Sequence, residues 1–296
     1  MDGSPARTVC AALILYFAAA TAVVSAREPG TALPQPDERT APLVIERDGG
    51  IVVMVRIQGA GPFRFRLDTG ASRTVVSNEL ARRIGLTRSG SSVLITPAGR
   101  TIRPLATVSE LTAGCVSAVG LRAIVVPAAD LEPGGRIDGL IGQDLLFGHV
   151  YTLDYERAML RCQPSGLDPA NAVRVPLTVT DGRALVSLPQ SRGPLSLVPD
   201  SGADRLVLFS RAGQPPNALI TPRETVRARS IAGQRVVRHV LVQALQIGSA
   251  RLGDHDGVLV DAPETELMGD GLLPLHLFAS VTFNGPAGYV AIEPRR

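Results

Sequence analysis

The chain contains no lysine and no tryptophan, and aromatic residues make up only 4% of it. All 30 of its basic residues are therefore arginines. Arginine clusters such as residues 223–229 have no aromatic residues between them, whereas proteins that bind single-stranded nucleic acid stack bases on aromatic rings. The net charge of +3 is also small. We interpret the clusters as solvated faces and expect no nucleic acid partner.

The sequence also lacks the motifs of two large hydrolase classes. No Gly-x-Ser-x-Gly elbow and no His-Glu-x-x-His helix motif occurs, which argues against a serine hydrolase and a zinc protease. His149, His239 and His276 show no spacing typical of metal ligands. The segment Asp254-His255-Asp256-Gly257 has ligand-type residues, but a polar turn before a strand at 258–260 explains it better. We expect neither a metal nor a cofactor.

Long apolar runs are confined to the N-terminus. Arg7 precedes an apolar run over residues 9–24, and small residues end at Ala26. This order predicts a secretory signal peptide over residues 1–26. An uncleaved anchor helix is the alternative, although the run is short for a bilayer span of about 20 residues. We expect an exported protein, periplasmic or secreted, with no stable membrane span after cleavage.

Two features of the exported part stay open at this point. Cys115 and Cys162 remain after signal removal, and in an oxidising compartment they form either a disulfide or two separate buried thiols. Residues 27–41 are polar and rich in proline, which predicts a flexible lead-in. This segment is either a linker or an inhibitory pro-segment.

The second half of the chain repeats the first at a constant offset. Gly-Pro at 61–62 recurs at 193–194, Asp-Thr-Gly-Ala at 68–71 recurs as Asp-Ser-Gly-Ala at 200–203, and Asp-Gly at 138–139 recurs at 270–271. Each pair is 132 positions apart, as for the two aspartates (200 − 68). Three anchors at one offset indicate a tandem duplication. We predict an N-terminal lobe over residues 42–165, a linker around residues 164–170 and a C-terminal lobe over residues 170–296.

Short apolar segments separated by glycine and proline predict a mostly β protein. Strands are expected at residues 50–57, 122–126, 150–155, 236–241 and 258–260. One short helix is expected to begin after Ser77, with Leu80 and Ile84 on one face and Gly85 at its end.

The duplicated aspartates have a chemical use. Hydrolysis of an amide without a metal or a nucleophile needs one group that takes a proton from water and another that donates one. Two carboxylates held face to face do not both ionise easily, so the pair supplies both functions. One aspartate from each lobe, Asp68 and Asp200, would form such a pair. We expect the glycine after each to let the backbone turn sharply.

These residues resemble the retropepsin-like aspartic proteases, of the exported bacterial type in which one chain contains both lobes. The resemblance covers roughly residues 49–293. It implies two duplicated β-barrel lobes with an active-site cleft between them, and Asp68 and Asp200 as the catalytic pair. Thr69 and Ser201 would clasp the lobes together. The remaining active-site loop residues implied are Gly70, Ala71, Gly202 and Ala203.

The resemblance also implies a set of substrate-binding residues. Asp204 would bind the substrate backbone or a nearby arginine. Two flap hairpins would turn at 96–99 and 230–233 and present Ala98, Gly99, Ala232 and Gly233.

Three departures from the family pattern stand out. Alanine follows each Asp-Thr/Ser-Gly, where pepsin-like enzymes often have serine, and this predicts a higher pKa for the pair and a less acidic optimum. Pro199 lies in a strand that ends at Asp200. Leu272-Leu273-Pro274 lacks the glycine found at Gly142, so the C-terminal lobe is the less regular one.

The expected function is that of an aspartic endopeptidase, a monomer that acts on peptide or protein substrates. The main alternative is a pseudo-protease that binds peptides between the lobes with little or no cleavage. An enzyme that cuts only itself or one dedicated partner is a further alternative.

Overall fold

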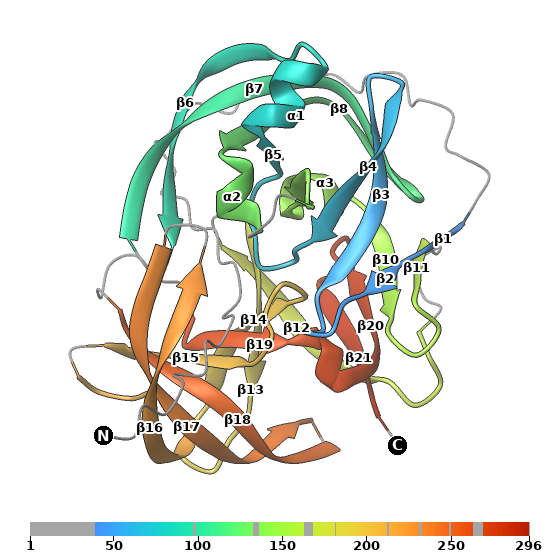
Figure 1. Ribbon diagram of the computed structural model, residues 1–296. Coiled ribbons are helices and arrows are strands. Elements are labelled where there is room, and N and C mark those ends of the chain that lie inside the picture. The colour runs from blue at the N-terminus through green and yellow to red at the C-terminus, as the bar shows by residue number, and fades with distance from the viewer. Residues whose placement is uncertain are drawn as a thin grey trace.

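The computed structural model describes residues 39–96, 99–132, 136–162, 168–180, 182–211, 213–230, 233–248, 250–262 and 269–295. Across these residues the chain is mostly β, which confirms the predicted fold class. Figure 1 shows two lobes, one from blue to green and the other from yellow to red. The predicted signal peptide and all but the last three residues of the predicted lead-in lie outside the described residues.

The N-terminal lobe is a closed barrel. Its sheet runs β2-β3-β4-β9-β5-β8-β7-β6, and β3 pairs with β7 as well as with β4. The alternating pattern of Val53, Val55 and Ile57 drives this closure, because every second side chain of β3 is buried inside. The strands are β2 (Val44–Ile45), β3 (Ile51–Ile57), β4 (Ala60–Leu67), β5 (Val75–Ser77), β6 (Thr87–Thr96), β7 (Gly99–Ala113), β8 (Val116–Val126) and β9 (Gly139–Ile141).

The C-terminal lobe has a matching strand order, β13-β14-β19-β15-β18-β17-β16. A buried apolar cluster that includes Val198, Val207 and Leu272 packs between its strands. The strands are β13 (Arg183–Leu188), β14 (Leu195–Asp200), β15 (Leu206–Arg211), β16 (Leu219–Ser230), β17 (Gly233–Ile247), β18 (Ala250–Ala262) and β19 (Gly271–Pro274).

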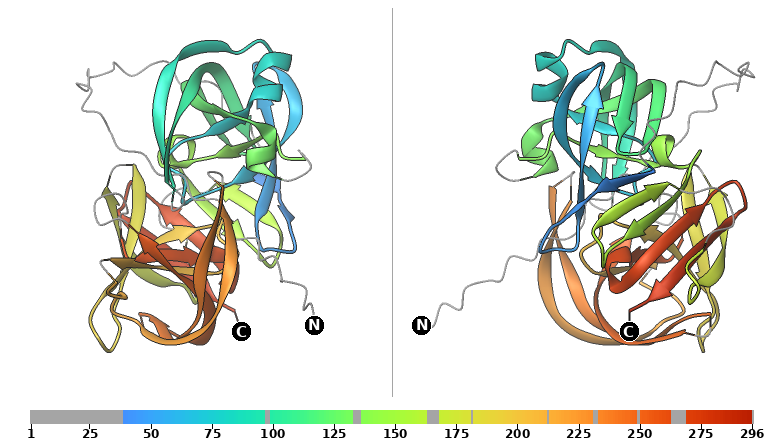
Figure 2. Two further views of the ribbon diagram at one scale, coloured as in Figure 1. Left: turned by 60° about the vertical axis from the view of Figure 1, so that its left-hand side comes forward. Right: turned by 90° about the vertical axis from the view of Figure 1, so that its right-hand side faces the viewer.

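Strands from both halves of the chain form a common sheet that joins the lobes. Its order is β1-β11-β10-β20-β21-β12, and the side-chain hydroxyls of Thr152 and Thr282 lie 2.8 Å apart at its centre. Strands on both sides of the predicted 165/170 division therefore share one sheet. They are β1 (Thr40–Pro42), β10 (Val150–Asp154), β11 (Met159–Cys162), β12 (Val173–Thr180), β20 (Phe278–Asn284) and β21 (Tyr289–Pro294), and Figure 2 shows the yellow-green strands of this sheet beside the red ones.

Strand registers in the two lobes correspond at the same offset as the sequence anchors. Phe65 of β4 pairs in parallel with Gly139, and Leu197 of β14 pairs in parallel with Gly271. Each of these residues lies 132 positions from its counterpart (197 − 65 and 271 − 139). The parallel pairings place the strand before each Asp-Thr/Ser-Gly loop beside a short apolar strand.

Helices are few and short in the described residues, and the predicted one is present. α1 (Asn78–Arg83) begins after Ser77, whose Oγ accepts a hydrogen bond from the Leu80 N–H at 3.0 Å. It is followed by Gly85, whose φ of 67° is favourable only for glycine among common residues. The others are α2 (Ala128–Leu131), α3 (Gln143–Leu146) and the 3₁₀ helix η1 (Leu275–Leu277).

One predicted turn is wrong. Residues 254–257 lie inside β18, where His255 pairs with Val242 and Asp256 with Leu241 of β17. The ladder between β17 and β18 is irregular just before this point, and Gly253 has a φ of 80°. Exposed polar side chains on a bulged strand give the same local pattern as a turn, which explains the error.

Pro199 fits into β14 because the hydrogen-bonded pairing of β14 with β13 ends before it. The pairing between β13 and β14 covers only Leu195 to Leu197. Pro199 lies beyond it, so its missing N–H removes no hydrogen bond from that ladder.

Candidate active site

Asp68 and Asp200 occupy corresponding places in the two lobes. Asp68 follows the last residue of β4, and its N–H donates to the carbonyl of Ile141 at 2.9 Å. Asp200 ends β14 and pairs with Pro274 of β19. Both side chains are buried, with 1% and 0% of their surface exposed. The parallel strand pairs thus deliver one carboxyl group from each lobe to the boundary between them.

The glycine of each loop lies against the carboxylate of the opposite lobe. A Cβ atom at Gly70 would be 2.5 Å from Cγ of Asp200, and one at Gly202 would be 3.0 Å from Cγ of Asp68. Neither glycine has a positive φ. These glycines are therefore required by the close approach of the two loops, and not by the sharp turn that the sequence suggested.

Thr69 and Ser201 join the two loops through reciprocal hydrogen bonds. The N–H of Thr69 donates to Oγ of Ser201, and the N–H of Ser201 donates to Oγ1 of Thr69, each at 3.0 Å. The Thr69 hydroxyl then donates to the Pro199 carbonyl at 2.7 Å, and the Ser201 hydroxyl donates to the Leu67 carbonyl at 2.6 Å. All four bonds are buried and link one lobe to the other, so they hold the aspartates at a set separation.

The two carboxylates have different hydrogen-bond environments. Oδ1 of Asp68 accepts from the N–H groups of Gly70 and Ala71, both at 3.0 Å. Oδ1 of Asp200 accepts from Gly202 N–H at 2.7 Å. The Oδ2 atoms of both aspartates are buried and have no hydrogen-bond partner among the described residues. These two oxygens are the carboxylate atoms that receive no hydrogen bond from the loops.

Burial makes both carboxyl groups weak acids. It raises the pKa of Asp68 to about 6, although the backbone donors of its loop oppose the shift. It raises the pKa of Asp200 well above its ordinary value, and the nearby Asp68 carboxylate adds to this effect. The two carboxyl groups titrate as a coupled pair, which consists of one carboxylate and one carboxylic acid when it carries one proton.

Hydrogen bonds made by Gln143 and Asp144 support the Asp68 loop. Nε2 of Gln143 donates to the Thr69 carbonyl at 2.8 Å. Oδ1 of Asp144 accepts from both the N–H and the hydroxyl of Thr74, each at 2.8 Å, and burial raises the pKa of Asp144 to about 6. The sequence predicted none of these supporting roles. A comparison of the two repeats could have found them. Leu275 and His276 stand 132 positions after Gln143 and Asp144 (276 − 144), so this polar pair is present in only one repeat.

The C-terminal lobe has Pro274, Leu275 and His276 at the corresponding positions. Pro274 and Leu275 are buried, and His276 packs so closely against the N-terminal lobe that a Cβ at Gly49 would lie 2.4 Å from its ring. A Cβ at the corresponding Gly142 would lie 2.4 Å from the Arg73 carbonyl carbon. Glycine is therefore required at position 142, just before α3. In the C-terminal lobe the corresponding residue is Pro274, which precedes the 3₁₀ helix η1 and not an α-helix.

Two of the four predicted flap residues begin the second strand of a long hairpin. Gly99 begins β7 and Gly233 begins β17, whereas Ala98 and Ala232 lie outside the described residues. In Figure 1 the β6–β7 hairpin extends toward the C-terminal lobe. Val93 of β6 packs against the buried cluster of that lobe. The N-terminal hairpin therefore bridges the two lobes.

Three further predicted residues have defined surroundings. Ala71 and Ala203 are buried within the apolar clusters beside the two loops. Asp204 forms an ion pair with Arg205, with its carboxylate oxygens 3.3 Å from Nε and Nη2. This pairing is one of the two roles that the resemblance implied for Asp204.

Cys115 and Cys162 form a disulfide, with their Cα atoms 6.0 Å apart. The bond connects the turn between β7 and β8 to β11 of the shared sheet. No helix in the described part of the chain combines the length and apolar character needed to cross a membrane.

Comparison with known proteins gives one family match. A family described as aspartyl protease matches residues 53–145, which contain the Asp68 loop and β9. A search of curated proteins returned no match. Among solved structures, the chain is similar to a retropepsin-like aspartic protease from Rickettsia conorii, at 18% identity and a TM-score of 0.31, over 42% of this chain and 89% of that one. Residues 53–145 therefore carry the pattern of the aspartyl protease family.

Proposed function

We propose that the protein is an aspartic endopeptidase in which Asp68 and Asp200 activate one water molecule for attack on a peptide bond. One observation carries the proposal. Each carboxylate lies against the glycine of the opposite loop, and the Thr69–Ser201 hydrogen bonds hold the loops in that position. Buried carboxyl groups at such close quarters retain a proton at mildly acidic pH.

The pKa values of the two aspartates suggest which one is the general base and which one is the general acid. Asp68, with a pKa of about 6, is the base that takes a proton from water. Asp200, with the higher pKa, is the acid that protonates the carbonyl oxygen of the scissile bond. As the tetrahedral intermediate collapses, its C–N bond breaks, the proton held by Asp68 passes to the leaving nitrogen, and a hydroxyl proton of the intermediate returns to Asp200. The proton taken from water is thus returned to the amine product.

We also infer that the lobes arose by tandem duplication and that the protein is exported. The equal strand registers at an offset of 132 support the first inference. The disulfide between Cys115 and Cys162 supports the second, because disulfides persist in oxidising compartments.

The test uses the protein without residues 1–26, a mixed peptide library and the variants Asp68→Asn and Asp200→Asn. We expect the wild type to cut inside peptides and each variant to lose activity by about 10³-fold or more, because each removes one proton-transfer group. Cleavage that survives in both variants would refute the mechanism. Cuts confined to peptide ends would replace endopeptidase with exopeptidase activity.

A peptide-binding pseudo-protease is the second candidate. The replacement of Gly142-Gln143-Asp144 by Pro274-Leu275-His276 favours it, because the Asp200 loop lacks the hydrogen bonds that Gln143 and Asp144 make to the Asp68 loop. Peptide binding by the wild type without cleavage at any pH would select this function. An enzyme dedicated to one partner would instead cut that partner while leaving the library intact.

A further inference from the structure

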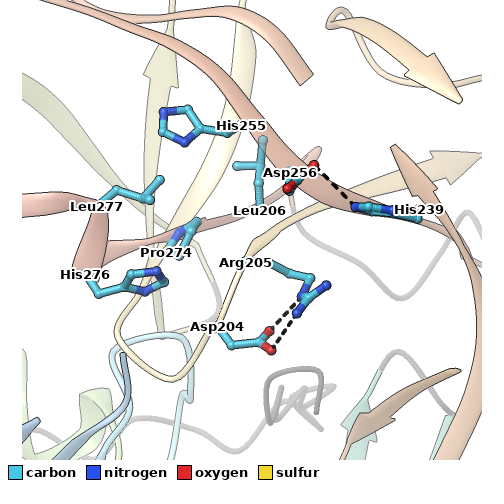
Figure 3. A pocket seen from close by; sticks show the side chains of 9 residues that line it. All are labelled: Asp204, Arg205, Leu206, His239, His255, Asp256, Pro274, His276 and Leu277. Atoms are coloured by element: carbon cyan, nitrogen blue, oxygen red, sulfur yellow. Dashed lines mark hydrogen bonds and ion pairs between the residues drawn. The ribbon is translucent and has the colours of Figure 1, made fainter. Parts of the chain in front are cut away.

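Three of the four histidines in the chain line one pocket in the C-terminal lobe (Figure 3). The pocket has a volume of about 340 Å³ and begins at Asp204, four positions after Asp200. Its charged and titratable walls are Asp204, Arg205, His239, His255, Asp256 and His276. The histidines come from three separate elements, β17, β18 and η1, so the fold and not a local motif brings them together.

The carboxylates of this pocket already have arginine partners. Asp204 makes its ion pair with Arg205, and Asp256 lies 2.9 Å from Nη1 of Arg223 and 3.4 Å from Nε2 of His239. Neutral histidines thus leave the pocket near electrical balance. Each histidine that gains a proton adds a positive charge with no further carboxylate in the pocket wall to offset it.

His276 is the histidine most strongly held by the fold. Its Nδ1 is buried without a geometric hydrogen-bond partner among the described residues, and burial lowers its pKa, although an interaction with the Ala203 backbone opposes the shift. The charged groups that act on it are Asp48, Arg295 and His255. A ligand that accepts a hydrogen bond from the protonated ring would satisfy this nitrogen and favour the charged form.

The pocket adjoins the candidate active site. Arg205 and Asp204 continue the Asp200 loop, and Pro274, in the pocket wall, is the register partner of Asp200. Within the described residues no cluster of His, Cys, Asp or Glu has the geometry to hold a metal ion. Three basic rings and an arginine beside a peptide-cutting centre fit an anion better.

We propose that this pocket binds a carboxylate of the peptide substrate, an acidic side chain near the scissile bond, when its histidines are protonated. The proposal rests on the proposed function and adds a substrate preference to it. Protonation supplies the charge, and the half-buried rings supply N–H donors for charge-assisted hydrogen bonds, in addition to the contacts that Nε2 of His239 makes with Asp256 and Nε2 of His255 makes with the Leu252 carbonyl. The preference for acidic peptides must therefore increase as pH falls.

The test compares peptides that differ only by glutamate or glutamine at successive positions around the scissile bond. At about pH 5 we expect glutamate at one position to raise kcat/KM about tenfold over glutamine, which is about the contribution of one charge-assisted hydrogen bond. At about pH 7.5 the two peptides should have nearly equal kcat/KM. The ratio of kcat/KM for the two peptides cancels the pH dependence that comes from Asp68 and Asp200.

Variants link the preference to the pocket. The double variant His239→Gln/His255→Gln should bring the glutamate-to-glutamine ratio to near parity at both pH values. His149→Gln, which alters the histidine outside the pocket, should leave the ratio as in the wild type. A preference that is absent, that does not change with pH, or that persists in the double variant would overturn the proposal.

A binding measurement separates failure of the pocket from failure of catalysis. In the Asp68→Asn protein, a glutamate peptide should shift the imidazole NMR signals of His239 and His255 at about pH 5, and its glutamine counterpart should not. Loss of cleavage together with these shifts would reject only the proposed catalysis. Shifts caused by inorganic phosphate but not by the glutamate peptide would mark a site for free anions and reject the assignment to substrate.

Discussion

At Gly70 a side chain would collide with the carboxylate of the other lobe. The distance from a built Cβ to Cγ of Asp200 is 2.5 Å, against 3.0 Å for the reverse contact between Gly202 and Asp68. Contacts below about 3 Å force either the loop or the carboxylate to move. The two glycines are therefore constrained to different degrees, and the Asp68 loop is the tighter.

This difference predicts the ranking of two substitutions. Gly70→Ala should lower kcat by about 10²-fold or more, because displacement of a reacting group by about 1 Å has that effect. Gly202→Ala should cost less. Gly148→Ala is the matched control, since its Cβ would meet nothing within 4 Å. Steady-state kinetics and thermal melts of the three variants test the ranking, which is wrong if Gly202→Ala is the more harmful.

The hydroxyls of Thr69 and Ser201 each make two buried hydrogen bonds across the lobe boundary. Loss of either hydroxyl leaves a buried N–H and a buried carbonyl without partners. Such groups are costly, because they gave up hydrogen bonds to water on folding.

We predict that Thr69→Val destabilises the protein by about 2–4 kcal/mol, since two buried groups lose their partners. Thr69→Ser keeps the hydroxyl and should restore most of this free energy. Denaturant unfolding measures the difference between the variants. Equal stability of the valine and serine variants would show that the hydroxyl contributes nothing to the joint between the lobes.

Among the secondary-structure elements, the short helices after β9 and β19 account for the asymmetry of the lobes. α3 places Gln143 and Asp144 in hydrogen bonds that support the Asp68 loop. η1 places His276 against the N-terminal lobe and toward the histidine pocket. One lobe therefore uses this segment to fix its aspartate, and the other uses it to line a pocket.

The disulfide between Cys115 and Cys162 connects two elements separated by 47 residues. A crosslink of that span reduces the freedom of the unfolded chain and should stabilise the protein by about 3–4 kcal/mol. We expect the variant Cys115→Ala/Cys162→Ala to lose that amount in denaturant unfolding. Reduced wild-type protein should behave like the variant. A wild type equally stable before and after reduction would contradict the prediction.

For the whole molecule, the pKa values of the pair determine the pH range of activity. The base, Asp68, must be ionised, so activity should fall as pH drops below its pKa of about 6. The acid, Asp200, must be protonated, so activity should fall again as pH rises past its pKa, which lies well above the ordinary value. The optimum should thus be less acidic than that of pepsin-like enzymes, as the alanines after each loop also suggest.

A profile of kcat/KM against pH measures both limits, because it reports ionisations of the free enzyme. We expect the acid limb to have its midpoint near pH 6. A maximum in the strongly acidic range of pepsin would show that the buried pair ionises more easily than its surroundings imply.

Several features could be predicted from the sequence because they depend on local patterns or on the repeat. The mostly β composition follows from short apolar segments between glycine and proline turns. Ser77 and Gly85 flank α1 as their capping preferences predicted. The pairing of Asp68 with Asp200 was predicted from the constant offset, and the structure brings the two together.

The failures have a physical cause in common. Residues 254–257 were expected to form a turn, because polarity and glycine favour turns locally, yet pairing with β17 makes them part of β18. The support from Gln143 and the histidine pocket likewise depend on contacts between segments far apart in the chain. Local propensities carry no information on such contacts.

The amino-acid sequence by itself determined the duplicated Asp-Thr/Ser-Gly loops, the strand-rich composition and the resemblance to retropepsin-like proteases. Only the tertiary structure decided that Cys115 bonds Cys162, that the loop glycines touch the opposite carboxylates and that three histidines share one pocket. Each of these depends on distances between elements, and those distances are established only when the β-sheets pack and bury their apolar faces.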